Sequence, residues 1–498
     1  MIDDAPYELV VGDVPRYANL TDLLTRQAAA RPDAEAVVQP LPERRSLSWP
    51  DLDEQVSAVA RGLAGQGLVA GHRVGLVGPN CLEFVVAYLA VLRAGLVAVP
   101  VDPDLEPGER NAMLRHRGVA VVLAADGLAD VERPALPLTS AGLSALAQPG
   151  SGSVTSPPDP EALAALVHTA GSTGDPKAVM LSHRALLAQT EHTATLDLVG
   201  PETTVLAMLP FFGVFGLSAV LGGWLGSGSR LVVLDGFEGF FDVVHGEQVT
   251  NLPTAPALLS RIVRDERSAT HLTSLTTVIC GGAALSEHLR ERFAAQTRLR
   301  VDLGYGLTEA AAGVSTTVGG RILGHGHVGR PLPGVEVRIG GGEDGDEPGE
   351  IQVRGANLFS GYWPDGADRP GPDGWFATGD VGYLRQGELF LVDRTSELIS
   401  VNGFLVYPAE VEEAILELPG VESVAVLGRP DPRTGSQVVA FVTGASLNRE
   451  AVEAHCAQRL ARFKRPAVIA VVDALPRGTT GQVQKGRLRA SLPTEEGS

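Results

Sequence analysis

A chain of 498 residues is too long for a single hydrophobic core, and its length predicts about three folding units. Apolar residues make up 44% and charged residues 20%, which is ordinary for a globular protein and excludes a disordered chain. The formal net charge of −19, from 40 basic and 59 acidic residues, argues against a nucleic-acid-binding surface, which needs clustered Lys and Arg.

Helices and strands alternate through the N-terminal quarter of the chain. Alternation of this kind predicts a parallel α/β layer that serves as a scaffold. The apolar spacing predicts helices within 19–66, a strand at 36–38, a strand at 73–79, a helix at 82–94, a strand at 96–101, and a further helix and strand up to Leu123.

A polar stretch at 148–160 predicts a linker, and a strand, a loop and a second strand follow it. The two apolar runs, 163–167 and 179–181, flank a loop of small residues. Glycines let backbone N–H groups converge on one anion, hydroxyls add donors, and a lysine adds positive charge. The loop is a candidate phosphate cradle, although surface loops of this composition are commoner, and it does not fit G-x-x-x-x-G-K-[ST]. Its candidate residues are Thr169, Gly171, Ser172, Thr173, Gly174 and Lys177.

The α/β pattern resumes after this loop and then changes twice. Short strands punctuated by Gly, Asp and Pro at 334–400 predict a small β-rich subdomain. Beyond Arg394, about a hundred residues predict a compact α/β domain. The predicted helices are one from 182 and others at 216–225, 408–418 and 448–460, and the predicted strands are 205–209, 231–234, 276–279, 421–427, 438–442 and 468–472.

These patterns predict an α/β protein of two domains. Residues 1–394 form a large N-terminal domain of layered α/β subdomains with a small β-rich subdomain. Residues 395–498 form a small C-terminal α/β domain.

Cysteine usage and the N-terminus indicate a reducing compartment. Cys81, Cys280 and Cys456 are far apart and lack metal-ligand spacing, so free thiols in the cytosol are expected. The N-terminus is acidic and lacks the basic region of a signal peptide, and the longest apolar stretch, 84–100, is interrupted by a charged residue. We therefore expect a cytoplasmic protein without an integral membrane segment.

Six stretches carry the motifs that suggest a function. In order and spacing they resemble the motifs of the adenylate-forming (AMP-binding) superfamily, and the likeness, which covers almost the whole chain, is greatest to bacterial acyl-CoA synthetases, the fatty acid–CoA ligases. The stretches are TAGSTGDPK (169–177), LPFFGVFGL (209–217), GYGLTE (304–309), GEIQVRGANLFSGYW (349–363), GWFATGD (374–380) and LVDRTSELISVNGFLVYPAEVEE (391–413).

The resemblance implies roles for the polar residues of these motifs. Tyr305 stacks on adenine, the alternative being a half-buried core tyrosine. Thr308 donates to the α-phosphate or the carboxylate, and Glu309 holds Mg²⁺. Asp380 accepts from the ribose hydroxyls, and Arg394 reaches the ribose or phosphate. The nucleotide-binding set implied is Thr169, Gly171, Ser172, Thr173, Gly174, Lys177, Gly281, Tyr305, Gly306, Thr308, Asp380 and Arg394.

The resemblance also implies a substrate pocket with small, apolar walls, which suits an aliphatic or aromatic acyl group. No charge occurs at 211–215, where amino-acid-activating relatives place an aspartate, so free α-amino acids are expected to be poor substrates. The predicted wall residues are Phe212, Gly213, Phe215, Gly282, Ala283, Gly304 and residues 310–313.

The chain departs from the family pattern at several functional positions. The implied catalytic residues are Thr308, Glu309 and Gln482, and the last replaces the lysine that follows LPRxxxG in the family. Ser396 replaces an Asp or Lys near the hinge, and Gly213 replaces a common histidine. Lys485 is not expected to replace the missing lysine, because the family already has a basic residue there.

The function implied is an acid–thiol ligase acting in two steps. A carboxylate attacks the α-phosphate of ATP to give acyl-AMP and pyrophosphate, and a thiol then displaces AMP, with the C-terminal domain mobile between the steps. ATP, Mg²⁺ and coenzyme A are the implied cofactors, and a small carboxylic acid is the substrate. Two alternatives stay open: a nucleotide-binding homologue without efficient turnover, and a ligase that loads an acyl carrier protein.

Overall fold

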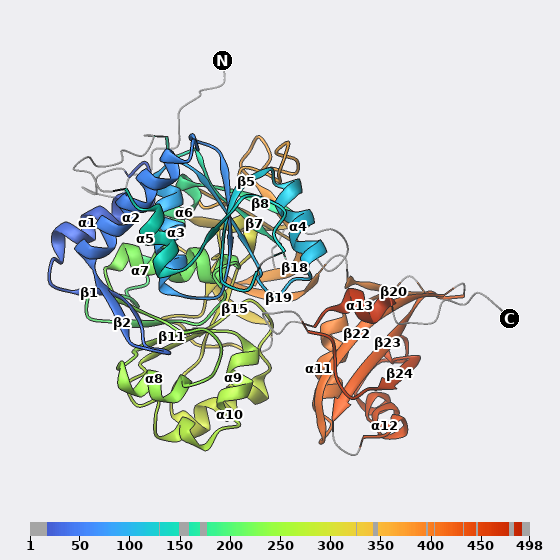
Figure 1. Ribbon diagram of the computed structural model, residues 1–498. Helices are drawn as coiled ribbons and strands as arrows, with labels where there is room; N and C mark the ends of the chain where they lie inside the picture. Colours follow the sequence, from blue (N-terminus) through green and yellow to red (C-terminus); the bar gives the residue numbers. More distant parts are fainter. Residues whose placement is uncertain are drawn as a thin grey trace.

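A large domain and a smaller C-terminal domain lie side by side in the computed structural model (Figure 1). The predicted boundary at 394/395 falls directly after the last strand of the large domain. The structure describes residues 17–128, 130–148, 159–169, 177–324, 326–341, 347–394, 397–402, 404–431, 433–444, 447–477 and 483–490.

The first sheet of the large domain has six strands in the order β6-β5-β3-β4-β7-β8, parallel except for the β7–β8 pair. One helix, α3, is apolar on every face apart from Glu83 and Arg93 at its ends, and every one of its residues is buried, so it lies within the core rather than at the surface. The strands are β3 (Arg73–Val77), β4 (Val97–Val101), β5 (Val119–Ala124), β6 (Ala135–Pro137), β7 (Leu163–His168) and β8 (Ala178–Ser182). The helices in this part of the chain are α1 (Asp22–Ala30), α2 (Trp49–Gly65), α3 (Leu82–Arg93), α4 (Pro107–His116), α5 (Ser140–Leu146) and α6 (His183–Ala194).

The second sheet is a path of thirteen strands, β16-β17-β18-β19-β15-β14-β13-β12-β11-β9-β10-β1-β2. Neighbours from β13 to β1 are parallel, and the pairs from β16 to β13 are antiparallel. Its parallel part and the helices beside it consist of β1 (Glu35–Gln39), β2 (Arg45–Ser48), β9 (Thr204–Ala207), the π-helix η1 (Phe215–Val220), α7 (Leu221–Ser227), β10 (Arg230–Val233), α8 (Phe240–Gly246), β11 (Asn251–Thr254), α9 (Pro256–Ile262), η2 (Glu266–Ala269), β12 (Thr277–Cys280), α10 (Glu287–Thr297) and β13 (Asp302–Tyr305).

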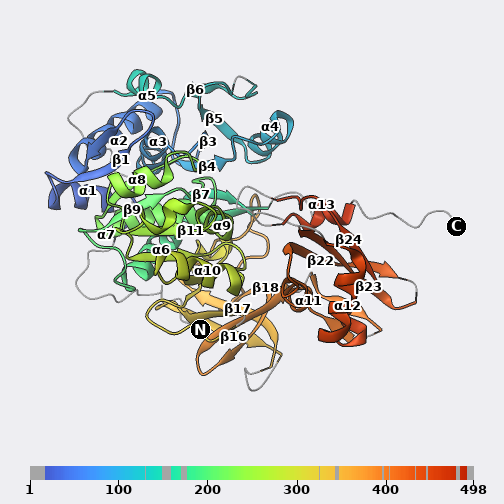
Figure 2. The same ribbon diagram turned by 90° about the horizontal axis from the view of Figure 1, so that it is seen from below.

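The antiparallel part confirms the predicted β-rich subdomain, and Figure 2 shows β16, β17 and β18 at the lower side of the large domain. Gly- and Asp-rich turns separate its strands, as the sequence predicts. Its elements are the 3₁₀ helix η3 (Thr308–Ala310), β14 (Ser315–Thr316), β15 (His327–Pro331), β16 (Val335–Gly340), β17 (Gly349–Gly355), β18 (Phe376–Arg385) and β19 (Glu388–Arg394).

The C-terminal domain is a five-stranded sheet with helices packed on it. Strand order is β21-β20-β23-β22, with β24 parallel to β23, and its own apolar cluster lies between sheet and helices. The elements are β20 (Ile399–Val401), β21 (Phe404–Val406), α11 (Pro408–Leu416), β22 (Val421–Asp431), β23 (Gly435–Gly444), α12 (Arg449–Arg459), η5 (Arg462–Lys464), β24 (Val468–Val471) and α13 (Lys485–Ala490).

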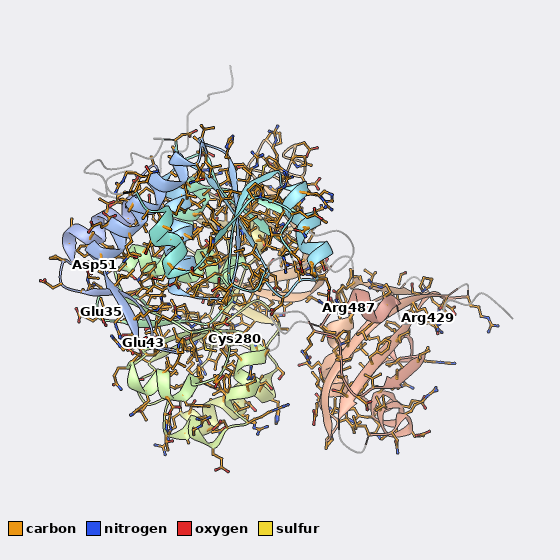
Figure 3. All side chains as sticks on the ribbon, viewed as in Figure 1. Glu35, Glu43, Asp51, Cys280, Arg429 and Arg487 are labelled. Carbon is orange, nitrogen blue, oxygen red and sulfur yellow. The ribbon has the colours of Figure 1, made fainter. Side chains whose placement is uncertain are left out.

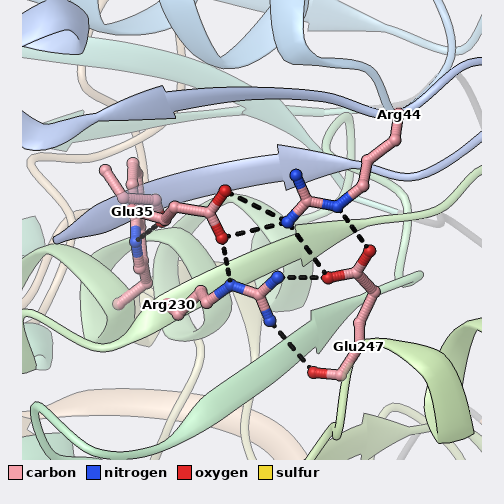
Figure 4. A network of polar contacts seen from close by, with 6 residues as sticks. Glu35, Arg44, Arg230 and Glu247 are labelled. Atoms are coloured by element: carbon pink, nitrogen blue, oxygen red, sulfur yellow. Dashed lines mark hydrogen bonds and ion pairs between the residues drawn. The ribbon is translucent and has the colours of Figure 1, made fainter.

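A network of charged side chains ties three segments of the large domain together, as Figure 4 shows. Arg44 donates to Glu35 at 3.0 Å and to Glu247 at 2.9 Å, and Arg230 pairs with both carboxylates. Burial opposes ionisation of Glu247, but hydrogen bonds from Arg44 and Arg230 outweigh it and lower the pKa of this carboxyl. The network therefore joins β1, β10 and the end of α8.

Charged side chains lie at the surface of both domains, whereas two of the three cysteines belong to the interior of the large domain. Glu35 and Asp51 lie at the edge of the large domain remote from the C-terminal domain, which carries Arg429 and Arg487 (Figure 3). Cys280 is 2% exposed, and burial raises the pKa of its thiol. Burial also raises the pKa of Cys81, to about 12, so neither thiol has the character of a nucleophile.

Within the described residues, no helix combines the length and apolarity needed to cross a bilayer.

Candidate active site

The predicted phosphate loop joins two paired strands. β7 and β8 are antiparallel, with Val167 opposite Val179, and the Thr169 N–H donates to the Lys177 carbonyl oxygen at 3.0 Å. Thr169 directly follows β7 and Lys177 directly precedes β8, so this bond joins the two residues at the ends of the paired strands. The other predicted loop residues, Gly171, Ser172, Thr173 and Gly174, lie outside the described residues.

Lys177 stands beside a chain of side chains that reaches the GYGLTE motif. Its Nζ lies 4.3 Å from the ring centroid of Tyr362 and 3.1 Å from Oδ2 of Asp368. The Tyr362 hydroxyl in turn donates to Oε1 of Glu309 at 2.5 Å. Burial and the nearby charge of Glu309 raise the pKa of Tyr362, so its proton stays in place as a donor. Lys177, Tyr362 and Glu309 therefore form one local group.

Tyr362 was not among the residues proposed for the site from the sequence, although it belongs to the GEIQVRGANLFSGYW stretch. Its backbone explains its position, because it forms a bridge with Val179 on β8 and its N–H donates to the Ala367 carbonyl oxygen at 2.9 Å. The signal available in the sequence was the motif itself, but spacing alone does not show which of its aromatic rings turns toward Glu309.

A second chain of polar contacts joins three predicted nucleotide-binding residues. The Tyr305 hydroxyl donates to Oδ2 of Asp380 at 2.7 Å, and Nε of Arg394 lies 3.0 Å from Oδ1 of the same carboxylate. Asp380 and Arg394 face each other across β18 and β19, so the sheet register places them together. Burial and the Asp380 charge raise the pKa of Tyr305 well above its usual range. Burial opposes the charge of Arg394, yet Asp380 and Glu397 raise its pKa overall.

The segment after GYGLTE is tightly held in an uncommon backbone conformation. Ala311 and Ala312 have φ of +50° and +110°, which alanine rarely adopts. A Cβ on Gly306 would overlap the Ala312 carbonyl oxygen, so only glycine fits there. The buried Asn357 amide donates to the carbonyl oxygens of Ala310 and Gly313, at 2.8 and 3.0 Å. These contacts fix η3, and with it Thr308 and Glu309.

An apolar cavity of about 170 Å³ lies between α6, η1, α7 and one face of the second sheet. Side chains alternate along β12, so that Val278 and Cys280 enter the cluster beside α9 and α10 while Thr277 and Ile279 line the cavity. Its lining comprises Gln189, Thr193, Leu196, Leu198, Val199, Val205, Val214, Phe215, Ala219, Val220, Gly223, Trp224, Asn251, Leu252, Pro253, Thr277, Ile279, Gly281, Gly282, Gly304, Tyr305, Gly306, Ala312, Gly313, Ser315, Thr316 and Leu332.

The cavity takes in part of the predicted pocket. Phe215, Gly282, Gly304, Ala312 and Gly313 line it, as do the predicted nucleotide residues Gly281, Tyr305 and Gly306. Phe212 and Gly213 lie in the turn before η1, Ala283 is exposed, and Ala310 and Ala311 are buried in the core; these described residues are not part of its lining. Four wall residues come from helices that carry no sequence motif: Gln189 and Thr193 on α6, and Gly223 and Trp224 on α7.

The C-terminal residues singled out in the sequence are only partly described. Gln482 and Ser396 lie outside the described residues. Lys485 is held between two carboxylates, with Nζ 2.7 Å from Glu397 and 2.8 Å from Glu412. Burial opposes its charge, but these two partners raise the pKa of Lys485. The Lys485 ammonium is therefore already paired within the protein, with Glu397 and Glu412.

The chain matches the family described as AMP-binding enzyme over residues 24–363, and the AMP-binding enzyme C-terminal domain over residues 410–482. It is 30% identical to a long-chain-fatty-acid–CoA ligase of Bacillus subtilis (strain 168), over 98% of this chain and 96% of that protein. It is 32% identical to a feruloyl-CoA synthase of Amycolatopsis sp, over 93% and 97%. The solved structure of ATP-bound MatB from Rhodopseudomonas palustris matches it with a TM-score of 0.86 at 27% identity, covering 95% of this chain and 99% of that one. These matches confirm the predicted α/β fold and the resemblance drawn from the motifs. The chain therefore belongs to the AMP-binding enzyme family.

Proposed function

We propose that this chain is an ATP-dependent carboxylic acid:CoA ligase that forms an acyl-AMP and then an acyl-CoA thioester. One observation carries the proposal: Tyr305 lines the apolar cavity while its hydroxyl donates to Asp380, which also pairs with Arg394. A site for an apolar acid thus adjoins a polar site suited to a ribose and a phosphate. The names of the curated relatives, which are CoA ligases, support the same reaction class.

The polar groups suit the first half-reaction. A bond forms between a carboxylate oxygen of the acid and the α-phosphorus, the α–β phosphoanhydride bond breaks, and pyrophosphate leaves with the electron pair. Each oxygen of Asp380 has a second lone pair beyond its contact with Tyr305 or Arg394, so both can still accept from vicinal ribose hydroxyls. Lys177 and Arg394 supply positive charge for the phosphates, and Thr308 supplies a hydroxyl donor.

Glu309 fits the Mg²⁺ that the family implies. Mg²⁺ in nucleotide sites is held by one or two carboxylates together with phosphate oxygens and water, and Glu309 is a partly exposed carboxylate fixed by the Tyr362 hydroxyl. When bound, the ion neutralises charge on the triphosphate as a Lewis acid. In the second half-reaction a thiol sulfur bonds to the acyl carbon, the acyl–phosphate bond breaks, and AMP leaves as the thiol proton passes to solvent.

We further propose that the first half-reaction is slow because Gln482 stands where the family has a lysine. The chain has only three lysines. Lys464 pairs with Glu410 at 2.6 Å, and Lys485 is held by Glu397 and Glu412. Lys177 already belongs to the local group with Tyr362 and Glu309. A neutral amide donates hydrogen bonds but brings no charge, and loss of one such stabiliser costs about 10²–10³ in rate.

The test compares Gln482→Lys with a matched control, Gln458→Lys, which adds the same charge at an exposed position of α12. ATP–pyrophosphate exchange with a panel of acids reports the first step, and thioester formation from supplied acyl-AMP and CoA reports the second. We expect Gln482→Lys alone to accelerate exchange, with the second step little changed. Exchange at ordinary ligase rates in the wild type, unchanged by Gln482→Lys, would contradict the slow first step.

The same assay separates the two alternatives. AMP release that requires CoA supports the ligase. AMP release only with an acyl carrier protein supports a carrier-loading enzyme, and ATP binding without exchange for any acid supports a nucleotide-binding homologue. The neutral cavity favours simple fatty or aryl acids, so exchange that is greatest with a free α-amino acid would overturn the substrate class.

A further inference from the structure

The cavity has few groups that could pair with a charged or polar group on a bound acid. Among the described residues its lining includes no charged side chain, and most of its polar side chains already have partners within the protein. Thr193 donates to the Gln189 carbonyl oxygen at 3.0 Å, and Asn251 donates to the Leu198 carbonyl oxygen at 2.7 Å. The Gln189 side-chain oxygen accepts from the Gly313 N–H at 3.1 Å. A second carboxylate or an ammonium on the acid would stay unpaired here, at a cost of several kcal/mol.

The cavity volume limits the size of the group that fits. A dry cavity of about 150 Å³ holds one benzene molecule, so the 170 Å³ found here corresponds to about seven carbon atoms. The wall formed by Trp224 cannot easily move back, because its ring stacks on Trp49 at a centroid distance of 5.1 Å and its Nε1–H donates to the Ala36 carbonyl oxygen at 2.9 Å. Both rings are fully buried.

The contact between α6 and α7 sets part of that volume. Gly223 and Thr193 both line the cavity, and a Cβ on Gly223 would lie 3.2 Å from the Thr193 methyl carbon. One methyl group there fits with a small shift and enters the cavity. The preceding Gly222 differs, because a Cβ would lie 2.7 Å from the Thr190 hydroxyl oxygen, at a helix contact rather than in the cavity.

We propose that this site takes uncharged monocarboxylic acids whose group beyond the carboxyl carbon has at most about seven carbons, and that Gly223 and Thr193 set this limit. The inference rests on the proposed ligase function and narrows its substrate class. It sets this chain apart from a ligase of long-chain fatty acids, although several of its curated relatives are named as such.

The test uses binding, so that a slow first step does not obscure it. Calorimetry on the full chain measures N-acylsulfamoyl adenosines, which mimic acyl-AMP, with hexanoyl, benzoyl, octanoyl and palmitoyl groups. We expect the first three to bind at least about tenfold more tightly than the palmitoyl compound, because one methylene group that does not fit a hydrophobic pocket costs about 10-fold or more in affinity. Palmitoyl binding as tight as hexanoyl would overturn the size limit. If none binds more tightly than AMP, the ligase function itself fails, and the inference with it.

Two variants with opposite signs test the named residues. Gly223→Ala narrows the cavity and should weaken octanoyl binding about tenfold while hexanoyl binding changes little. Thr193→Ser removes the facing methyl and should shift the preference toward the octanoyl compound. Circular dichroism checks the fold, and if Gly223→Ala does not fold, Thr193→Ser decides alone, because it only removes a methyl group. An unchanged size preference in Thr193→Ser, or shifts of the same sign in both variants, would overturn the assignment.

Discussion

Replacing Tyr362 by Phe removes one atom from the proposed active site, the hydroxyl oxygen that donates to Glu309 at 2.5 Å. A hydrogen bond to a charged group contributes about 1.5–3 kcal/mol, which corresponds to roughly a 10- to 150-fold change. Loss of a group that orients a metal-binding carboxylate costs about 10- to 100-fold in metal affinity or activity. The ring itself stays, so its contact with Lys177 at 4.3 Å and its packing on Phe359 are kept. We therefore expect a loss of about 10- to 100-fold in acyl-AMP formation, with little change in the unfolding midpoint.

The assay is ATP–pyrophosphate exchange measured across a Mg²⁺ titration. The expected signature is a rise in the Mg²⁺ concentration needed for half-maximal exchange, because Glu309 would be less well oriented. Tyr88→Phe is the matched control, since the Tyr88 hydroxyl is buried in α3 and has no hydrogen-bond partner in the described part of the chain. If Tyr362→Phe exchanges at the wild-type rate with an unchanged Mg²⁺ midpoint, the Tyr362–Glu309 contact has no part in the reaction.

Three further predictions follow from other contacts. Lys177→Ala should weaken ATP binding in calorimetry but leave the unfolding midpoint unchanged, because the ion pair of Lys177 with Asp368 is mostly exposed. An unchanged ATP affinity would show that the predicted phosphate loop between β7 and β8 does not bind the nucleotide. Burial lowers the pKa of His183 and of His192 from 6.5 to about 4. The unfolded chain therefore takes up protons first, and the free energy of unfolding should fall as the pH drops from about 6.5 toward 4. Because each histidine contributes up to about 1.36 kcal/mol per pH unit, the two together contribute up to about 2.7 kcal/mol per pH unit. Urea midpoints that stay level between pH 7 and 5 would contradict this. Ala312→Gly should raise the free energy of unfolding measured in urea by about 1 kcal/mol, because φ of +110° strains alanine, whereas Ala295→Gly within α10 should lower it by a similar amount. Losses in both variants would show that residue 312 is not strained.

Much of the fold could be read from local patterns, because each depends on residues close in the chain. The apolar run at 82–94 predicts α3 (Leu82–Arg93), and the structure buries this helix completely. The segments missed were mainly short elements such as α8, β11 and α9, of four to seven residues. Elements of this length show too few turns or alternations for their periodicity to be recognised, and tertiary packing decides them.

The motifs likewise predict which segments carry the chemistry, because glycines, hydroxyls and charges at fixed spacing are a local property of the chain. The contacts among those segments were decided only by the tertiary structure. Asp380 on β18 meets Tyr305 on β13 across 75 positions, and Tyr362 meets Glu309 across 53, although neither pair lies on neighbouring strands. The cavity shows this most clearly: its size depends on how closely α7 packs on α6 at Gly223, and no pattern in the sequence encodes the distance between two helices.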